Sequence, residues 1–172
     1  MRWARALLLP LAACLAQCAK DPTGLFVSIT VDSALADNVN FAVIRVFDAS
    51  TSATSMEPHI AERTFAITPG QTYTLFVEKT GTRSRVRLEL DAVRVTPGGG
   101  GGGLQLPMPG MGVVNDRAVV SYAEDKVLKV PMGLYNACRS GVLRMPCPAN
   151  NRCTSNGTCT MFEVSNPAQY NW

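Results

Sequence analysis

The chain contains a single histidine, His59, so the commonest general base and metal ligand of proteins is almost missing from its 172 residues. No G-x-S-x-G segment marks a strained nucleophile turn. His59 follows Pro58 in a loop or at the start of a strand, and we expect it to be a surface residue. The sequence therefore predicts a protein that is not an enzyme and that needs no cofactor.

The chain also has little excess of either positive or negative charge. The formal net charge is +3, and leaving out Arg2 and Arg5, which belong to the first segment, reduces it to about +1. Aromatic residues make up only 7% of the chain and no basic stripe contains them, so nucleic acid is not an expected partner. Beyond the first segment, no apolar run reaches the roughly 18 residues of a transmembrane helix. The rest of the chain should therefore be water-soluble.

The first segment, MRWARALLLPLAACLAQC, has the layout of a secretory signal peptide. Arg2 and Arg5 form a short positive region, and the apolar run over 6–16 is too short to cross a bilayer as a helix. A cysteine at the end of such a segment is typical of a bacterial lipobox, where the signal is cleaved just before a cysteine that carries lipid. The sequence therefore predicts a signal peptide over 1–17 and a lipidated tether over 18–24.

Two cysteines, Cys14 and Cys18, compete as the lipid acceptor. The residues before Cys14 match a lipobox well, whereas Gln17 before Cys18 is larger than the usual Gly, Ala or Ser. Cleavage before Cys14, however, would leave an apolar run of about eight residues interrupted by Pro10, and it would leave Cys18 without a partner. We therefore predict that Cys18 carries the acyl chains, such as palmitate. The alternatives are lipid on Cys14 and ordinary cleavage after Ala16, which would release a secreted protein.

Segments that alternate β-branched and aromatic residues fill the middle of the chain. Turn signals such as Pro69-Gly70 separate them, and almost no helical period occurs. The sequence predicts an all-β fold, an antiparallel β-sandwich of immunoglobulin-like or transthyretin-like kind, in a domain over 25–135. Its strands are expected at 25–32, 40–48, 60–68, 72–78, 84–96, 118–122 and 126–134.

Alternation also assigns side chains to faces of the predicted sheets. In the segment 84–96 the apolar residues should face the core and the charged ones should face solvent, namely Arg85, Arg87 and Glu89. Aspartates are expected at strand ends or turns, where they bond locally: Asp32, Asp37, Asp48 and Asp91. Most aromatic residues are expected in the core: Phe26, Phe41, Phe47, Phe65, Tyr73 and Phe76.

Six consecutive glycines, Gly98 to Gly103, lie in the segment 97–112 between two predicted strands. A phosphate-binding loop would need a Gly-Lys-Ser/Thr ending that opens a helix, and neither the lysine nor the helix is present. We therefore expect a flexible surface loop within the domain.

The clearest chemistry lies in the Cys-rich C-terminal segment over 136–172. Its cysteines have no C-x2-C spacing and no neighbouring histidine, so a metal site is not predicted. An exported chain meets an oxidising compartment, where an even set of cysteines forms disulfides. Few apolar residues accompany them, so we expect two covalent staples in a small lobe that caps the sandwich. These cysteines are Cys138, Cys147, Cys153 and Cys159, which allow three pairings.

Parts of the chain resemble known proteins. The segment CPANNRCTSNGTC resembles half of an EGF-like module, which implies the interleaved pairs Cys138–Cys153 and Cys147–Cys159. The order of CAKDPT at the tether, a strand ending in VDS, the strand KVLKVPMGLYNAC and the final cysteines is similar to a group of myxobacterial and related lipoproteins. The function of that group is not known, so the resemblance implies only location and architecture. Gln17 and the long glycine loop depart from its pattern.

The function expected from the sequence is that of a non-enzymatic, lipid-anchored protein of the cell envelope. It would contact the membrane through its anchor and bind a protein or glycan partner through the sandwich. Ala19 after Cys18 favours the outer membrane if the enterobacterial sorting rule applies. The alternative function is a secreted or anchored carbohydrate-binding module, and a hydrolase ranks third.

Overall fold

The structure is a computed structural model, and it describes residues 22–36, 38–49, 58–95, 112–139, 147, 151–164 and 167–169. This part of the chain is all-β, as predicted, and its only helical elements are the 3-10 helices η1 and η2 (Ser33–Leu35 and Asn136–Cys138). The strands are β1 (Gly24–Val31), β2 (Phe41–Asp48), β3 (Ala61–Ala66), β4 (Thr72–Glu78), β5 (Arg85–Val93), β6 (Val114–Ser121), β7 (Val127–Leu134), β8 (Asn151–Cys153) and β9 (Cys159–Met161).

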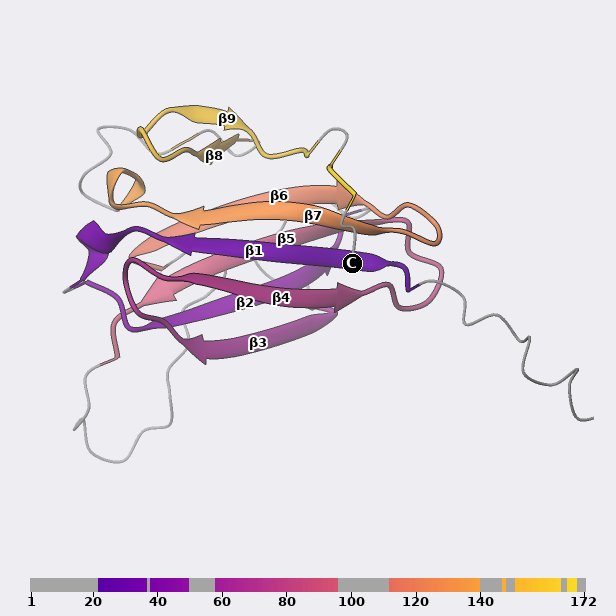
Figure 1. The fold of residues 1–172 in the computed structure, drawn as a ribbon, viewed down its shortest axis with the longest axis horizontal. Coiled ribbons are helices and arrows are strands. Elements are labelled where there is room, and N and C mark those ends of the chain that lie inside the picture. Colours follow the sequence, from indigo (N-terminus) through magenta and orange to yellow (C-terminus); the bar gives the residue numbers. More distant parts are fainter. Residues whose placement is uncertain are drawn as a thin grey trace, which may run out of the picture.

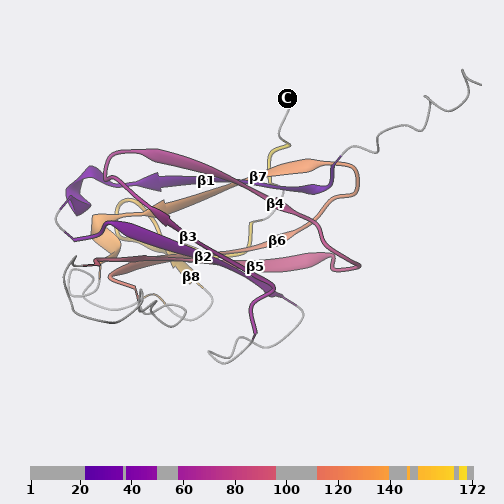
Figure 2. The same cartoon turned by 90° about the horizontal axis from the view of Figure 1, so that it is seen from below.

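The first seven strands form two stacked sheets, which Figure 2 shows edge-on. The three-stranded sheet has the order β4-β1-β7, and the four-stranded sheet has the order β3-β2-β5-β6. Neighbouring strands are antiparallel except β1 and β7, which run parallel, a pair that the sequence pattern did not indicate. Because β1 and β2 lie in different sheets, the strand order differs from that of a constant-type immunoglobulin domain, whose first two strands share a sheet.

Alternation of apolar residues along each strand builds one core between the sheets. Its inward side chains include Leu25, Val27 and Ile29 from the three-stranded sheet, and Leu88 and Leu90 from the four-stranded one, all without measurable exposure. Burying each such side chain contributes about 1.5–3 kcal/mol. The seven strands of the two sheets lie where the sequence predicts them, except that β6 begins several residues before the expected start, whereas β8 and β9 were not predicted.

The two sheets differ in width by one strand. In Figure 1, β4 lies over β2, whereas β3 lies beyond β4 with no strand over it. The exposure of the residues follows this arrangement, because β2 is buried from Ala42 to Phe47 while every residue of β3 except Phe65 is exposed. Within the part of the chain that the structure describes, the sandwich therefore has an uncovered margin, which is formed by β3 and β4.

The C-terminal segment covers the opposite margin of the sandwich, which is formed by β6 and β7. The amide of Val119 donates to the carbonyl of Phe162 at 2.9 Å, and the amide of Val164 donates back to the carbonyl of Val119 at 2.9 Å. Farther along, the amide of Lys129 donates to the carbonyl of Ala168 at 2.7 Å. These bonds satisfy backbone groups that edge strands otherwise leave unpaired. The β8–β9 hairpin lies beside β6 in Figure 1.

One face that the sequence assigns to solvent is buried. Arg87 and Glu89 of β5 are only 5% and 6% exposed. Asp91, expected at a strand end, lies within β5 and is fully buried. The alternation correctly predicted which residues share a face. The prediction that this face is exposed to solvent was wrong, because an alternating pattern does not show whether polar partners neutralise buried charges.

Phe76 also differs from its predicted place in the core. It occupies an outward position of β4 and is 45% exposed. On the neighbouring strand Gly24 has no side chain, and a Cβ there would collide with the ring of Phe76. The ring therefore lies over a glycine on the outer surface of the sheet.

Several predictions concern residues outside the described ranges. They are the signal peptide over 1–17, the lipid acceptors Cys14 and Cys18, and the glycine loop apart from Gly112.

Candidate functional site

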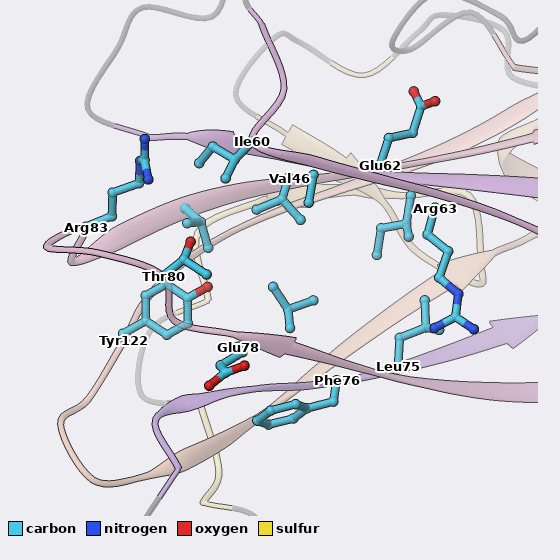
Figure 3. Close-up of a pocket in the computed structure, with 14 residues that line it drawn as sticks. Val46, Ile60, Glu62, Arg63, Leu75, Phe76, Glu78, Thr80, Arg83 and Tyr122 are labelled. Carbon is cyan, nitrogen blue, oxygen red and sulfur yellow. The ribbon is translucent and has the colours of Figure 1, made fainter.

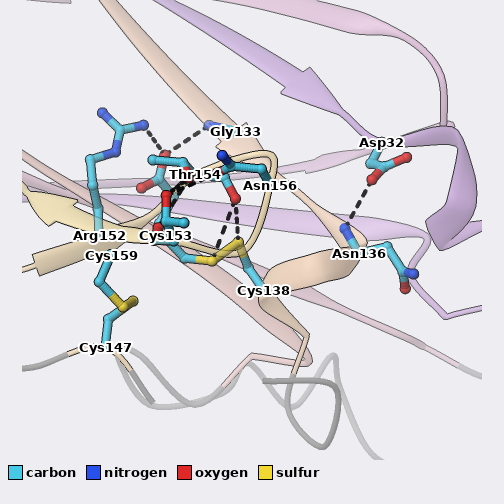
Figure 4. The surroundings of a disulfide bond; sticks show 12 residues. Asp32, Gly133, Asn136, Cys138, Cys147, Arg152, Cys153, Thr154, Asn156 and Cys159 are labelled. Atoms are coloured by element: carbon cyan, nitrogen blue, oxygen red, sulfur yellow. Dashed lines mark hydrogen bonds and ion pairs between the residues drawn. A yellow bond between two sulfur atoms is a disulfide. The ribbon is translucent and has the colours of Figure 1, made fainter. Parts of the chain in front are cut away.

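The four C-terminal cysteines form two disulfides, which Figure 4 shows. They join Cys138 to Cys153 and Cys147 to Cys159, which is the interleaved pairing that the EGF-like resemblance implies. Cys138 and Cys153 are buried and belong to the same hydrophobic core as the strands. The first disulfide is therefore part of the wall of the sandwich and not of a detached lobe.

Asp116 joins the C-terminal hairpin to the sandwich. Its carboxylate points inward from β6 with 2% exposure and accepts hydrogen bonds from Arg152 on β8 and from the amide of Gly133, the latter at 2.7 Å. Figure 4 labels the two donor residues. Arg152 also donates to the carbonyl of Pro131 at 3.1 Å. Burial raises the pKa of Asp116, although Arg152 and the backbone donors act in the opposite direction. This cluster is structural, because its polar groups are satisfied by one another.

Asp32 fastens the end of β1 to the start of the C-terminal segment. Its carboxylate accepts from the amide of Ala34 at 3.0 Å, which caps η1, and from the amide of Asn136 at 3.1 Å, which opens η2 (Figure 4). Asp32 therefore forms the local hydrogen bond predicted for it at a strand end, and it also forms a long-range hydrogen bond with Asn136.

A groove of about 310 Å³ opens at the uncovered margin, between the start of β3 and the end of β4 (Figure 3). Its floor consists of inward aliphatic side chains from both sheets: Ile44, Val46, Val86, Leu75 and Val77. The volume is at the lower end of the range for small-molecule pockets, which are mostly apolar with a few polar groups. The groove is therefore suited to hold an apolar group.

Two aromatic rings lie between β3 and β4 toward the connection that joins the two strands. Phe65 and Tyr73 face each other across the gap with ring centroids 5.7 Å apart. The Tyr73 hydroxyl accepts a hydrogen bond from the amide of Thr68 at 2.6 Å, which holds the ring in place. The space between the two strands is thus filled at this end and open at the other.

Charged groups lie around the mouth of the groove. Arg63 is paired in register with the core residue Ile44, so its side chain leaves β3 on the inward side, toward the groove (Figure 3). Within the described ranges, neither Arg63 nor Glu78 has an ion-pair or hydrogen-bond partner for its side chain. Arg83, in contrast, forms an ion pair with Asp48, in which Nε and Oδ2 are 3.3 Å apart. The mouth therefore offers one unengaged cation and one unengaged anion.

Tyr122 supplies a polar group at the end of the groove away from Arg63 (Figure 3). Burial raises the pKa of Tyr122 to about 12, so the hydroxyl keeps its proton at neutral pH. No described residue accepts a hydrogen bond from this hydroxyl. An apolar groove with one such donor can orient a bound group as well as hold it.

A second cluster of charges lies on the outer face of the four-stranded sheet. Arg45 contacts Glu62 at 2.6 Å and Asp91 at 3.0 Å. Beside this group, Arg87 lies 3.1 Å from Glu89. The guanidinium of Arg87 also stacks 4.6 Å from the ring centroid of Phe47. Apart from Glu62, which is exposed, these charges are buried, and they pair with one another, which favours a structural role for them.

His59 is exposed, as the sequence predicts, and its ring meets that of Phe47 edge-on with centroids 6.4 Å apart. In the described ranges it has no acidic or hydroxyl partner, and no group of three or more His, Cys, Asp or Glu could hold a metal ion. No helix of those ranges is long and apolar enough to cross a membrane.

Comparison of the chain with models of protein families, with curated proteins and with solved structures found no match. Any assignment of function therefore depends on the chain's own residues.

The groove was not predicted from the sequence. Its lining comes from β2, β3, β4 and β5 and from the turns that follow β4 and β6, which sequence patterns do not bring together. One signal was present, since the segment that became β3 (AERTFA) contains fewer apolar residues than its neighbours. Such a strand is typical of a sheet edge with little to cover it.

Proposed function

We propose that this chain is a non-enzymatic binding module, held at the cell envelope by lipid on Cys18, whose binding site is the groove between β3 and β4. One observation carries the proposal. The groove combines an aliphatic floor with the unengaged Arg63 and the Tyr122 hydroxyl, while no described residues form a nucleophile-and-base pair beside it. Such a site suits binding and orientation more than chemistry.

The anchor is supported by the sequence of the first segment. A single acyl chain binds membranes only marginally, whereas the two or three chains of a bacterial lipoprotein cysteine hold a protein firmly. Ala19 in the position after Cys18 favours the outer membrane over retention at the inner one. Secretion without lipid is the alternative location.

Fractionation of cells that produce the wild type or Cys18→Ala tests the anchor. The wild type should sediment with the outer membrane and its first residue should carry diacylglyceryl, whereas the variant should lose the lipid. Cys14→Ala is the matched control and should remain anchored. Lipid on Cys14, or a mature chain that begins at Gln17 without lipid, would contradict the assignment.

The binding site is tested with the dye ANS, an apolar anion that becomes fluorescent on apolar surface. The native protein should bind the dye, and Leu75→Glu, which places a negative charge on the groove floor, should abolish the signal. Thr74→Glu, one residue away on the outward face of β4, is the control and should leave the signal unchanged. Equal signals from the two variants would show that the dye binds elsewhere.

One observation favours carbohydrate as a second candidate ligand. Phe76 is the only large aromatic residue among the exposed hydrophobics of the described ranges, and it lies next to the groove. Glycan binding usually needs such a ring as a stacking surface. A glycan array that responds to the wild type and not to Phe76→Ala would support this candidate, and an array without any response would remove it.

A further inference from the structure

The direction of the free backbone groups of β4 follows from its pairing with β1. The amide of Lys79 donates to the carbonyl of Thr23 at 3.0 Å, so the odd-numbered residues of this stretch form the hydrogen-bonded pairs with β1. In an antiparallel pair the intervening residues direct their N–H and C=O groups to the other side. Four even-numbered residues therefore present unpaired backbone groups at the uncovered margin: Thr72, Thr74, Phe76 and Glu78.

Among the described residues, no protective feature is present at this edge of β4. Natural edge strands are blunted by proline, by lysine, by a bulge or by a covering segment. The sequence of β4, TYTLFVE, contains neither proline nor lysine, and its register with β1 is unbroken. On the opposite margin the chain does cover its edges, through the bonds that Phe162, Val164 and Ala168 make to β6 and β7. The chain thus covers the edges of β6 and β7, whereas no described residue covers the outer edge of β4.

The place beside β4 is also the place where a strand is missing. A strand added there would lie over β3, which has no strand over it (Figure 1). Its alternate side chains would enter the groove beside Leu75 and Val77, and the others would continue the outward row of Thr74 and Phe76. Peptide recognition by strand addition has this form, with affinity from main-chain hydrogen bonds and specificity from pockets for alternate side chains.

The charge at the groove indicates the kind of segment that fits. Arg63 directs its guanidinium toward the groove from β3, and no described residue pairs with it. An inward carboxylate on the added strand would meet this cation. A second copy of this chain would offer TYTLFVE, whose inward residues Tyr73, Leu75 and Val77 carry no charge, and it would bring a second Arg63 to the same margin. A different partner is therefore the better fit.

We infer that the uncovered margin binds an extended peptide segment of another protein, which adds to β4 as a fourth strand. The segment places alternate apolar side chains in the groove and one carboxylate opposite Arg63. The inference rests on the proposed function, because it names the partner of the same groove.

Selection from a displayed library of random peptides of about ten residues, the upper length of ordinary strands, tests this inference. The purified full-length protein with its disulfides intact serves as the target. Enriched peptides should alternate apolar and polar residues and should contain an acidic residue at an inward position. A selection that enriches no such pattern would overturn the inference.

Two proline variants then locate the bound peptide. Thr74→Pro removes one outward amide of β4 without touching the bonds to β1, and it should weaken binding about three- to tenfold, as expected for one hydrogen bond. Thr64→Pro is the matched control, since it removes an outward amide of β3 and should leave the affinity unchanged. Amide exchange at Thr74 and Phe76 should slow when the peptide binds. Equal affinities for both variants would overturn strand addition to β4.

A charge test completes the experiment. Arg63→Gln should weaken binding of the selected acidic peptide about two- to fivefold and should not affect a peptide whose acid is replaced by its amide. A dimer that dissociates in Thr74→Pro would show that a second copy is the occupant and would overturn the inference. Failure of the peptide tests, with ANS still bound at the groove and lost in Leu75→Glu, would leave the proposed binding function standing. Failure of the ANS test alone would remove the proposed site.

Discussion

The guanidinium of Arg152, on β8, donates to the carboxylate of Asp116, which β6 directs into the interior of the sandwich. The two residues are 36 positions apart, and the same arginine reaches the carbonyl of Pro131 on β7. One side chain thereby attaches the C-terminal hairpin to both strands of the covered margin. Since burial nevertheless raises the pKa of Asp116, the ion pair does not fully offset the cost of removing this charge from water.

Asp116→Asn should therefore change how stability depends on pH. The pKa of Asp116 in the folded chain lies above its ordinary value of 3.8, so the folded chain binds more protons at this site than the unfolded chain does. The contribution of Asp116 to stability is then fully present below the unfolded pKa and is lost as the pH rises through the folded pKa. As the pH rises from acid to neutral, the melting temperature of the variant should rise relative to that of the wild type. Parallel curves would contradict the raised pKa.

The strands were predictable from the sequence because their pattern is local. Alternation of β-branched and aromatic residues fixes which residues form a strand and which share a face, and segments such as 72–78 were recovered with their ends. The pairing of strands was not predictable, because it depends on contacts far apart in the chain. The parallel pair of β1 and β7 joins Gly24 to Val127, and no local signal encodes it.

The candidate site was less predictable than the fold. The groove exists because one sheet has a strand fewer than the other, which is a property of the whole topology. The buried charges on the outer face were misassigned for a related reason. Arg45 and Asp91 are 46 positions apart. The pattern of residues within one strand therefore cannot show that each of these buried charges has an oppositely charged partner.

The ion pair between Arg45 and Asp91 should contribute more to the free energy of unfolding than a surface ion pair does. Asp91 is fully buried and accepts hydrogen bonds from Arg45 at 3.0 Å and from the amide of Gly112 at 3.2 Å. Arg45→Met or Asp91→Leu alone removes one ionic partner of a buried charge and should cost about 3–5 kcal/mol in the free energy of unfolding. The double variant should recover much of this loss in a double-mutant cycle by urea denaturation. Additive losses would show that the two residues do not interact.

Tyr122→Phe and Tyr73→Phe form a matched pair of variants, of which only Tyr122→Phe changes the lining of the groove. The hydroxyl of Tyr73 accepts from the amide of Thr68, so its loss should destabilise the fold by about 1 kcal/mol. The hydroxyl of Tyr122 has no described partner, so its loss should change stability by less than about 0.5 kcal/mol. Absorbance titration should also show that the component with a pKa of about 12, one of four tyrosines, disappears in Tyr122→Phe alone. A large loss of stability in Tyr122→Phe would reveal a partner for its hydroxyl.

The two disulfides should differ in what their loss does to the fold. The half-cystines lie 15 residues apart in Cys138–Cys153 and 12 residues apart in Cys147–Cys159, and closing loops of this size contributes about 3 kcal/mol each through the unfolded chain. Cys138 and Cys153 are also buried in the core, whereas Cys159 is exposed. Replacing the first pair by alanine should therefore cost more than replacing the second, because it also removes buried sulfur contacts from the core.

Urea denaturation of the two double variants measures the difference in free energy of unfolding, and circular dichroism with and without reductant measures the strand content. The reduced wild type should keep its strand signal, because most residues of the core between the two sheets come from β1 to β7. Equal losses in the two variants would show that burial of the first disulfide adds nothing. Complete loss of strand signal on reduction would show that the sandwich depends on its C-terminal staples.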